Sequence, residues 1–154
     1  MTHTEHTYTS HLAWQGSTGA GYAAYDRFHT AVTPPAATEI RLSSDAAFRG
    51  DPELVNPEQL LVLAASSCQL LSFLAVAARG KVDVVSYEDL AVGVMPMDVS
   101  PIRITTIALT PRIVVAAGTD LASVEQMLRD AHDQCYIANS LTTEITVSPT
   151  ITHV

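Results

Sequence analysis

Basic residues are scarce in this sequence. The 154-residue chain has one lysine and seven arginines against sixteen acidic residues, which gives a formal net charge of −8. Nucleic acids and anionic membrane surfaces select for clustered positive charge, and this chain has no run of basic residues. The composition therefore argues against a nucleic-acid-binding protein and against a protein that docks on a membrane surface.

Charge of either sign is also low. Charged residues make up only 16% of the chain, whereas hydrophobic residues make up 47%. This composition and length predict one folded domain over residues 1–154 with a sizeable apolar core. A surface so poor in charge also favours an oligomer that hides part of its apolar area.

The N-terminal region lacks the cationic start and apolar run of a secretory signal, so we expect a cytoplasmic protein. Its histidines, His3, His6 and His11, lie in a polar leader and are expected to be solvated rather than to bind a metal. The uncharged segment from Leu60 to Ala78 has the length of a membrane span. It contains several serines and Gln69, so we interpret it as a helix of a globular core instead.

The pattern of apolar residues predicts an α+β fold with mainly antiparallel sheets around a long buried central helix. Asn56-Pro57-Glu58 is a strong helix start, and Gly80 ends that helix. A second helix starts at Thr119 or Asp120 and ends near Cys135. Its apolar residues fall on one face: Leu121, Val124, Met127, Leu128 and Ala131. Strands are expected within residues 7–33 (two or three), 38–43, 82–94, 102–116 and 143–152, with a short turn at 139–141.

The chain has only two cysteines, Cys68 and Cys135. They stand too far apart for a paired-ligand zinc motif, which leaves a metal site only as a long-range assembly that could include His132. Both could be ordinary buried thiols, which are common core residues. Cys68, however, has the polar neighbours Ser66, Ser67 and Gln69 in an otherwise apolar helix, and polar groups there usually serve a site or a partner.

Two motifs resemble those of the OsmC/Ohr family, the osmotically inducible protein C and organic hydroperoxide resistance proteins. The first is Asn56-Pro57-Glu58-Gln59-Leu60, followed by an alanine-rich stretch that reaches Cys68 ten residues after the glutamate. The second is Cys135-Tyr136-Ile137-Ala138-Asn139-Ser140-Leu141. The resemblance covers nearly the whole chain in element order.

The resemblance implies an OsmC-like fold, an intertwined homodimer and a cysteine-based peroxidase active in the oxidative stress response. Cys68 would attack an organic hydroperoxide and become a sulfenic acid, and Cys135 would then form a disulfide with it. No metal, haem or flavin cofactor is implied; a dithiol or lipoyl-type partner would reduce the enzyme again. The family arginine is assigned by position to Arg27, with Glu58 orienting it, while Arg41 and Arg49 remain alternatives.

Helix geometry adds a constraint, because ten residues at ~1.5 Å each place Glu58 ~15 Å from Cys68 along one helix. Glu58 must therefore act through a long arginine or reach the cysteine of a second chain, which favours a dimer with paired sites. Two other functions stay open. The protein could be a non-catalytic member that binds a small apolar ligand at its dimer interface, or the cysteines could form a permanent structural disulfide.

Overall fold

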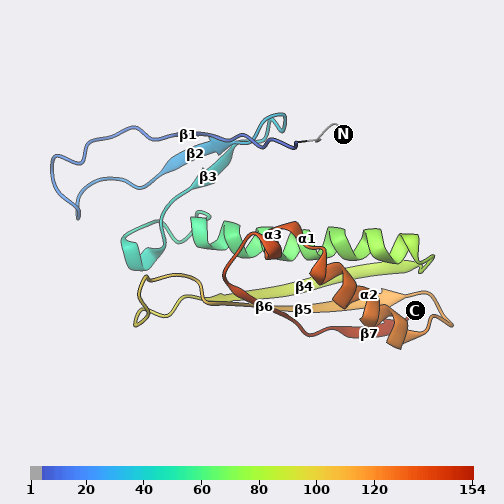
Figure 1. The fold of residues 1–154 in the computed structure, drawn as a ribbon. Helices are drawn as coiled ribbons and strands as arrows, with labels where there is room; N and C mark the ends of the chain where they lie inside the picture. The colour runs from blue at the N-terminus through green and yellow to red at the C-terminus, as the bar shows by residue number, and fades with distance from the viewer. Residues whose placement is uncertain (1–4) are drawn as a thin grey trace. The chain divides into compact units, whose positions relative to one another are not determined.

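A computed structural model describes residues 5–154, so His3 lies outside the described residues. The chain divides into two compact units, one that ends at Leu60 and one that runs from Leu61 to Val154. Figure 1 shows the order of helices and strands along the chain. The α+β fold class is confirmed.

The first unit contains a small antiparallel sheet in the order β1-β2-β3. Its strands are β1 (His11–Ala13), β2 (His29–Val32) and β3 (Ile40–Leu42). They match the strands predicted within residues 7–33 and 38–43. A short 3-10 helix, η1 (Ala46–Phe48), follows, and the Asp45 side chain caps its start by accepting a hydrogen bond from the Ala47 amide.

The long helix α1 (Pro57–Arg79) begins with a reciprocal cap. The Asn56 side chain accepts a hydrogen bond from the Gln59 amide at 2.8 Å, and the Gln59 side chain accepts one from the Asn56 amide at 3.0 Å. Pro57 occupies the first helical position, where no amide donor is needed. The predicted helix start is confirmed, and the cap also fixes the position of Glu58 in the first turn.

The second unit is built on a sheet in which β5 is the central strand. Its strands are β4 (Val84–Val94), β5 (Thr106–Val115), β6 (Glu144–Val147) and β7 (Thr150–His153). The β4 strand pairs with β5 in antiparallel fashion, whereas β6 and β7 both run parallel to β5. The sheet is therefore mixed.

The prediction of one closing strand over residues 143–152 is wrong, because Ser148 and Pro149 divide it into β6 and β7. The Ser148 amide still donates to the Leu109 carbonyl of β5 at 2.9 Å. Pro149 has no amide hydrogen and cannot continue the ladder. The alternation of apolar and polar residues persists through both strands, which is why the interruption is not visible in the pattern alone.

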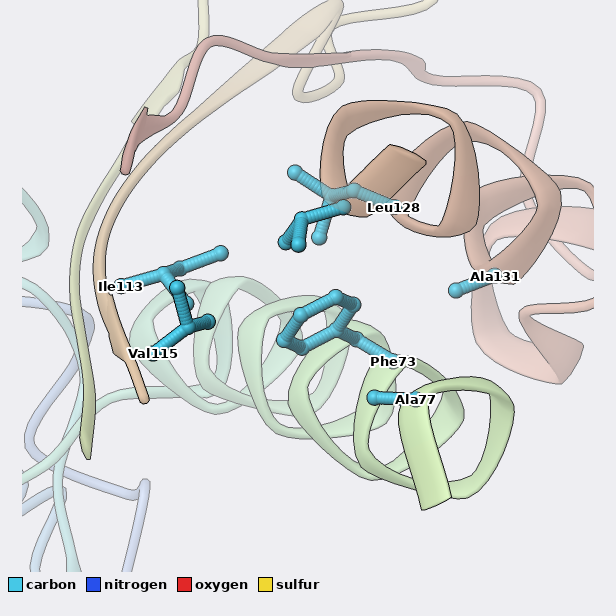
Figure 2. Close-up of a cluster of buried hydrophobic side chains, with 7 residues drawn as sticks. Phe73, Ala77, Ile113, Val115, Leu128 and Ala131 are labelled. Carbon is cyan, nitrogen blue, oxygen red and sulfur yellow. The ribbon is translucent and has the colours of Figure 1, made fainter. Parts of the chain in front are cut away.

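The core of this unit lies between the sheet and two helices, α1 and α2 (Leu121–Asp133) (Figure 2). Phe73 and Ala77 of α1 pack with Ile113 and Val115 of β5, and Leu128 of α2 belongs to the same buried cluster. The predicted apolar face of the second helix is confirmed: Val124, Leu128 and Ala131 are buried in this cluster, and Leu121 and Met127 pack against it. The Asp120 side chain caps the helix through the Ala122 amide.

Helix α1 is not buried on all sides within the single chain, in contrast to the prediction of a buried central helix. Its buried side chains are Ala65, Gln69, Phe73 and Ala77, which follow a four-residue spacing and so lie on one face. Leu63 and Leu71, by contrast, are 61% and 63% exposed. By length and composition α1 could also cross a membrane, and 22% of its most apolar window is buried. Within the second unit, much of the apolar surface of α1 is therefore exposed.

Candidate active site

Cys68 and Cys135 come together in the second unit, although 67 positions separate them. Cys68 lies in the middle of α1 and is half-buried, whereas Cys135 follows α2 and is only 1% exposed. Both are free thiols, and their side chains are hydrogen-bonding neighbours. The two sulfur atoms are thus already adjacent in the reduced protein.

The sulfur of Cys68 faces several hydrogen-bond donors. They are the backbone amides of Ile137 and Tyr136, the hydroxyl of Ser72 and the thiol of Cys135. Ser72 is one helical turn beyond Cys68 on α1, so its hydroxyl reaches back along the same face. Donors that converge on one sulfur favour its anionic form, which is the nucleophilic form of cysteine.

The pKa values of the two cysteines shift in opposite directions. Burial raises the pKa of Cys68, but the hydrogen bonds it receives, led by that of the Ile137 backbone, outweigh burial and hold the pKa below its usual value. Burial raises the pKa of Cys135, and its hydrogen bond to Cys68 together with the charge on Cys68 raises it further. Of the two cysteines, Cys68 is therefore the one that loses its proton at the lower pH.

The turn between α2 and the short helix α3 (Tyr136–Asn139) presents the backbone donors. Cys135 has an extended conformation, with φ −71° and ψ 110°, and so redirects the chain between the two helices. The side chain of Asn139 donates to the carbonyl oxygen of Asp133 at 3.0 Å and ties the end of α3 to the end of α2. The predicted turn at residues 139–141 thus begins earlier, as a helical turn from Tyr136.

Arg27 lies in the first unit and is 9% exposed. Its guanidinium donates to the backbone carbonyls of Tyr25 at 2.5 Å and Tyr22 at 2.6 Å, and it lies 3.8 Å from the centroid of the Tyr25 ring. These contacts hold the guanidinium in one place. Arg27 also lines a largely apolar cavity of about 350 Å³ with Trp14 and His29.

The other candidate arginines are held less firmly. Arg41 lies over the ring of Phe28 at 5.3 Å, and Arg49 lies 6.0 Å from the ring of Tyr22. Glu58 is half-buried in the first turn of α1. Arg27 and Glu58 belong to the first unit and the cysteines to the second, so their action on the thiol pair stays a prediction.

Ser72 and the amides of Tyr136 and Ile137 were not predicted as site groups from the sequence. The one signal for Ser72 was its four-residue spacing from Cys68 in an apolar helix, whereas backbone amides carry no residue-type signal. In the described residues 5–154, no group of three or more His, Cys, Asp or Glu side chains is arranged to hold a metal ion.

Comparisons with known proteins identify the family and the fold. A family model described as OsmC-like protein matches residues 50–150, which include both cysteines. An OsmC-like protein of unknown function from Vibrio cholerae is 28% identical, with a TM-score of 0.84; the match covers 95% of this chain and 100% of the other. No protein of curated function matches significantly.

Two more distant structures share the fold. An organic hydroperoxide resistance protein from Elizabethkingia anophelis has a TM-score of 0.69 at 15% identity, with 99% of both chains covered. Another from Legionella pneumophila has a TM-score of 0.67 at 15% identity, with 98% of this chain and 99% of that chain covered.

Proposed function

Because the chain belongs to the OsmC-like family, we propose that it is a thiol-dependent peroxidase that reduces organic hydroperoxides. One observation carries the proposal: Cys68 and Cys135 are adjacent free thiols whose pKa values move in opposite directions. A peroxidatic cysteine must react as a thiolate and its resolving partner must be a nearby thiol, and the directions of the two pKa shifts support these roles for Cys68 and Cys135. The names of the two hydroperoxide resistance proteins support the choice of substrate.

In the first step, the Cys68 thiolate attacks the outer oxygen of the hydroperoxide. A sulfur–oxygen bond forms, the peroxide oxygen–oxygen bond breaks, and the alkoxide that leaves takes a proton to become an alcohol. Cys68 is oxidised to the sulfenic acid, and the hydroperoxide is reduced. The hydrogen-bond donors around the Cys68 sulfur stabilise the thiolate that reacts in this step.

In the second step, the sulfur of Cys135 attacks the sulfenic sulfur of Cys68. The disulfide bond forms, the sulfur–oxygen bond breaks, and the Cys135 proton leaves with the hydroxide as water. An external dithiol or lipoyl-type reductant then opens the disulfide by thiol exchange and returns both thiols. In this proposal the protein needs no metal, haem or flavin, and it works in a reducing cytoplasm.

Arg27 and Glu58 complete the proposed site. A guanidinium near Cys68 would further lower its pKa, since an opposite charge within a few ångströms favours the charged form. Arg27 is suited to this role because it is buried and its guanidinium is held in place. Glu58 would orient the arginine, which is consistent with its fixed position in the first turn of α1.

We also propose that the active form is a homodimer. Uncovered leucines along α1, Leu63 and Leu71 among them, offer an apolar surface for a second copy. The distance of ~15 Å between Glu58 and Cys68 along α1 adds a reason for paired sites, because one helix cannot bring the two side chains together.

The test is a mass measurement on the purified protein. After treatment with one equivalent of an alkyl hydroperoxide, the intact mass should fall by two hydrogens, and peptide mapping should find the bond between Cys68 and Cys135. Cys68→Ser should consume no peroxide above background. If Cys68→Ser consumes peroxide as fast as the parent, the proposed chemistry is wrong. Two thiols that stay free after peroxide would instead favour a ligand-binding protein.

A further inference from the structure

Gln69 and His132 connect the helix that carries Cys68 to the helix that precedes Cys135. Gln69 is the next residue after Cys68 on α1, and its side chain is 0% exposed. Its Nε2 donates to the carbonyl oxygen of Leu128 at 3.3 Å, and its Oε1 lies 3.1 Å from Nδ1 of His132. Both partners belong to the last turns of α2, so one buried amide bridges the two helices.

The chemistry of the amide determines the direction of these bonds. The Leu128 carbonyl oxygen can only accept, so the amide nitrogen of Gln69 must face it and the amide oxygen must face the ring of His132. That oxygen can only accept, so His132 carries a hydrogen on Nδ1 and donates it. Turning the amide over would leave buried polar groups unpaired, which fixes the orientation of the bridge.

A backbone hydrogen bond also links His132 to Cys135. The Cys135 amide donates to the carbonyl oxygen of His132 at 3.0 Å. A closed path therefore runs from Cys68 to its neighbour Gln69, across a hydrogen bond to His132, across another to Cys135, and back through the contact of the two thiols. A closed path of this kind restricts how far Cys135 can move from Cys68.

We propose that Gln69 and His132 are positioning residues that hold Cys135 where it can close the disulfide with Cys68. The inference rests on the proposed function and deepens it. Neither side chain is assigned contact with the peroxide. They hold the two thiols in a fixed geometry. This raises the effective concentration of the Cys135 sulfur relative to the Cys68 sulfur.

The first experiment measures that effective concentration without peroxide. The disulfide is formed with diamide and equilibrated in buffers of reduced and oxidised dithiothreitol. Gln69→Met, which keeps the side-chain volume, and His132→Phe, which removes the donor, should each lower the effective concentration about tenfold. This corresponds to a reduction potential about 30 mV less negative.

Two matched variants serve as controls. His132→Asn places an amide N–H near the position of Nδ1 and should restore the parental value within about twofold. Gln126→Met makes the same chemical change at an exposed position of α2 and should also stay within about twofold. If Gln69→Met does not fold, the comparison of His132→Phe with His132→Asn carries the test, because the ring of His132 is only half-buried.

The second experiment separates this inference from the proposed function. After a hydroperoxide pulse at a pH above the pKa of Cys68, where the thiolate fraction no longer depends on the Cys135 donor, dimedone should trap more Cys68 sulfenic acid in Gln69→Met and His132→Phe than in the parent. The rate of peroxide consumption in the first turnover should stay unchanged at that pH. A parent that never reacts with peroxide would refute the proposed function and leave the dithiothreitol result to stand by itself. If both variants keep the parental effective concentration, even with lower melting temperatures, the residues are structural and the inference is overturned.

Discussion

The thiol of Cys135 lies within hydrogen-bonding reach of the sulfur of Cys68, and this contact contributes to the difference in pKa between the two cysteines. The hydrogen bond stabilises the thiolate of Cys68. The same bond, together with burial and the charge on Cys68, keeps the proton on Cys135. Over the pH range between the two pKa values, one sulfur is therefore the nucleophile and the other its proton donor.

Removal of the Cys135 donor should raise the pKa of Cys68. Cys135→Ala abolishes the hydrogen bond, whereas Cys135→Ser retains a hydroxyl donor. A hydrogen bond to a charged group contributes ~1.5–3 kcal/mol and one pKa unit corresponds to ~1.4 kcal/mol, so Cys68 should titrate about one unit higher in the alanine variant than in the serine variant. Each variant has a single cysteine, so ultraviolet thiolate absorbance against pH measures Cys68 alone.

The rate of Cys68 alkylation by iodoacetamide should follow the same titration. The rate rises with pH and levels off above the pKa of Cys68, and a lowered pKa moves this plateau to lower pH than for an ordinary cysteine. Equal titration curves for Cys135→Ala and Cys135→Ser would contradict the hydrogen bond as a cause of the shift.

The hydroxyl of Tyr87 offers an independent test of the core. Within the described residues this hydroxyl is buried and has no hydrogen-bond partner. Burial and the nearby charge of Asp89 raise the pKa of Tyr87, so the group remains neutral. Tyr87→Phe should leave stability unchanged or increase it by up to ~1 kcal/mol, because an unpaired buried hydroxyl costs free energy. Urea unfolding measures the difference.

A matched substitution sharpens that test. Phe73 packs against the ring of Tyr87, with centroids 5.9 Å apart, and is fully buried. Phe73→Ala should cost ~3–5 kcal/mol in the same urea experiment. A loss of stability in Tyr87→Phe that approaches the loss in Phe73→Ala would mean that the Tyr87 hydroxyl has a partner.

Several features could be predicted from the sequence because they depend on local chemistry. The helix start at Asn56-Pro57-Glu58 and the apolar face of α2 follow from residue type and spacing alone. The pairing of Cys68 with Cys135 was implied by a resemblance, and no spacing rule would bring together residues so far apart. The divided last strand was missed because Pro149 interrupts the ladder without interrupting the alternation.

The donors to Cys68 were missed for a different reason. Tyr136 and Ile137 act through backbone amides, so their side chains carry no signal of the role. Their amides face Cys68 only because Cys135 adopts an extended conformation between two helices. The residue types in this segment do not reveal that backbone conformation. The bridge between Gln69 and His132 likewise depends on how α2 packs on α1, and each residue alone reads as an unremarkable polar side chain.

The exposed face of α1 predicts how the proposed dimer would respond to charge. Leu71→Asp places a carboxylate on that face, and burial of a leucine is worth ~1.5–3 kcal/mol, so the dimer dissociation constant should rise at least tenfold. Leu71→Met keeps an apolar side chain and should change it by less than about threefold. Sedimentation velocity over a range of concentrations measures both. If Leu71→Asp sediments as the parent does at every concentration, this face is not the interface.

Arg27 is the arginine whose loss should most affect Cys68. If its guanidinium stabilises the thiolate, Arg27→Ala removes a positive charge and raises the pKa of Cys68 by ~1 unit or more. At a pH below both the parental and the new pKa, the thiolate fraction then falls about tenfold per unit, and the peroxide and iodoacetamide rates should fall together. Arg27→Lys should retain part of the shift, because it keeps the charge but loses the planar donors that bind the carbonyls of Tyr25 and Tyr22.

Arg41→Ala and Arg49→Ala, which remove the same charge elsewhere in the first unit, should keep both rates within about twofold of the parent. A titration of Cys68 that moves in Arg41→Ala or Arg49→Ala and not in Arg27→Ala would transfer the role to that arginine.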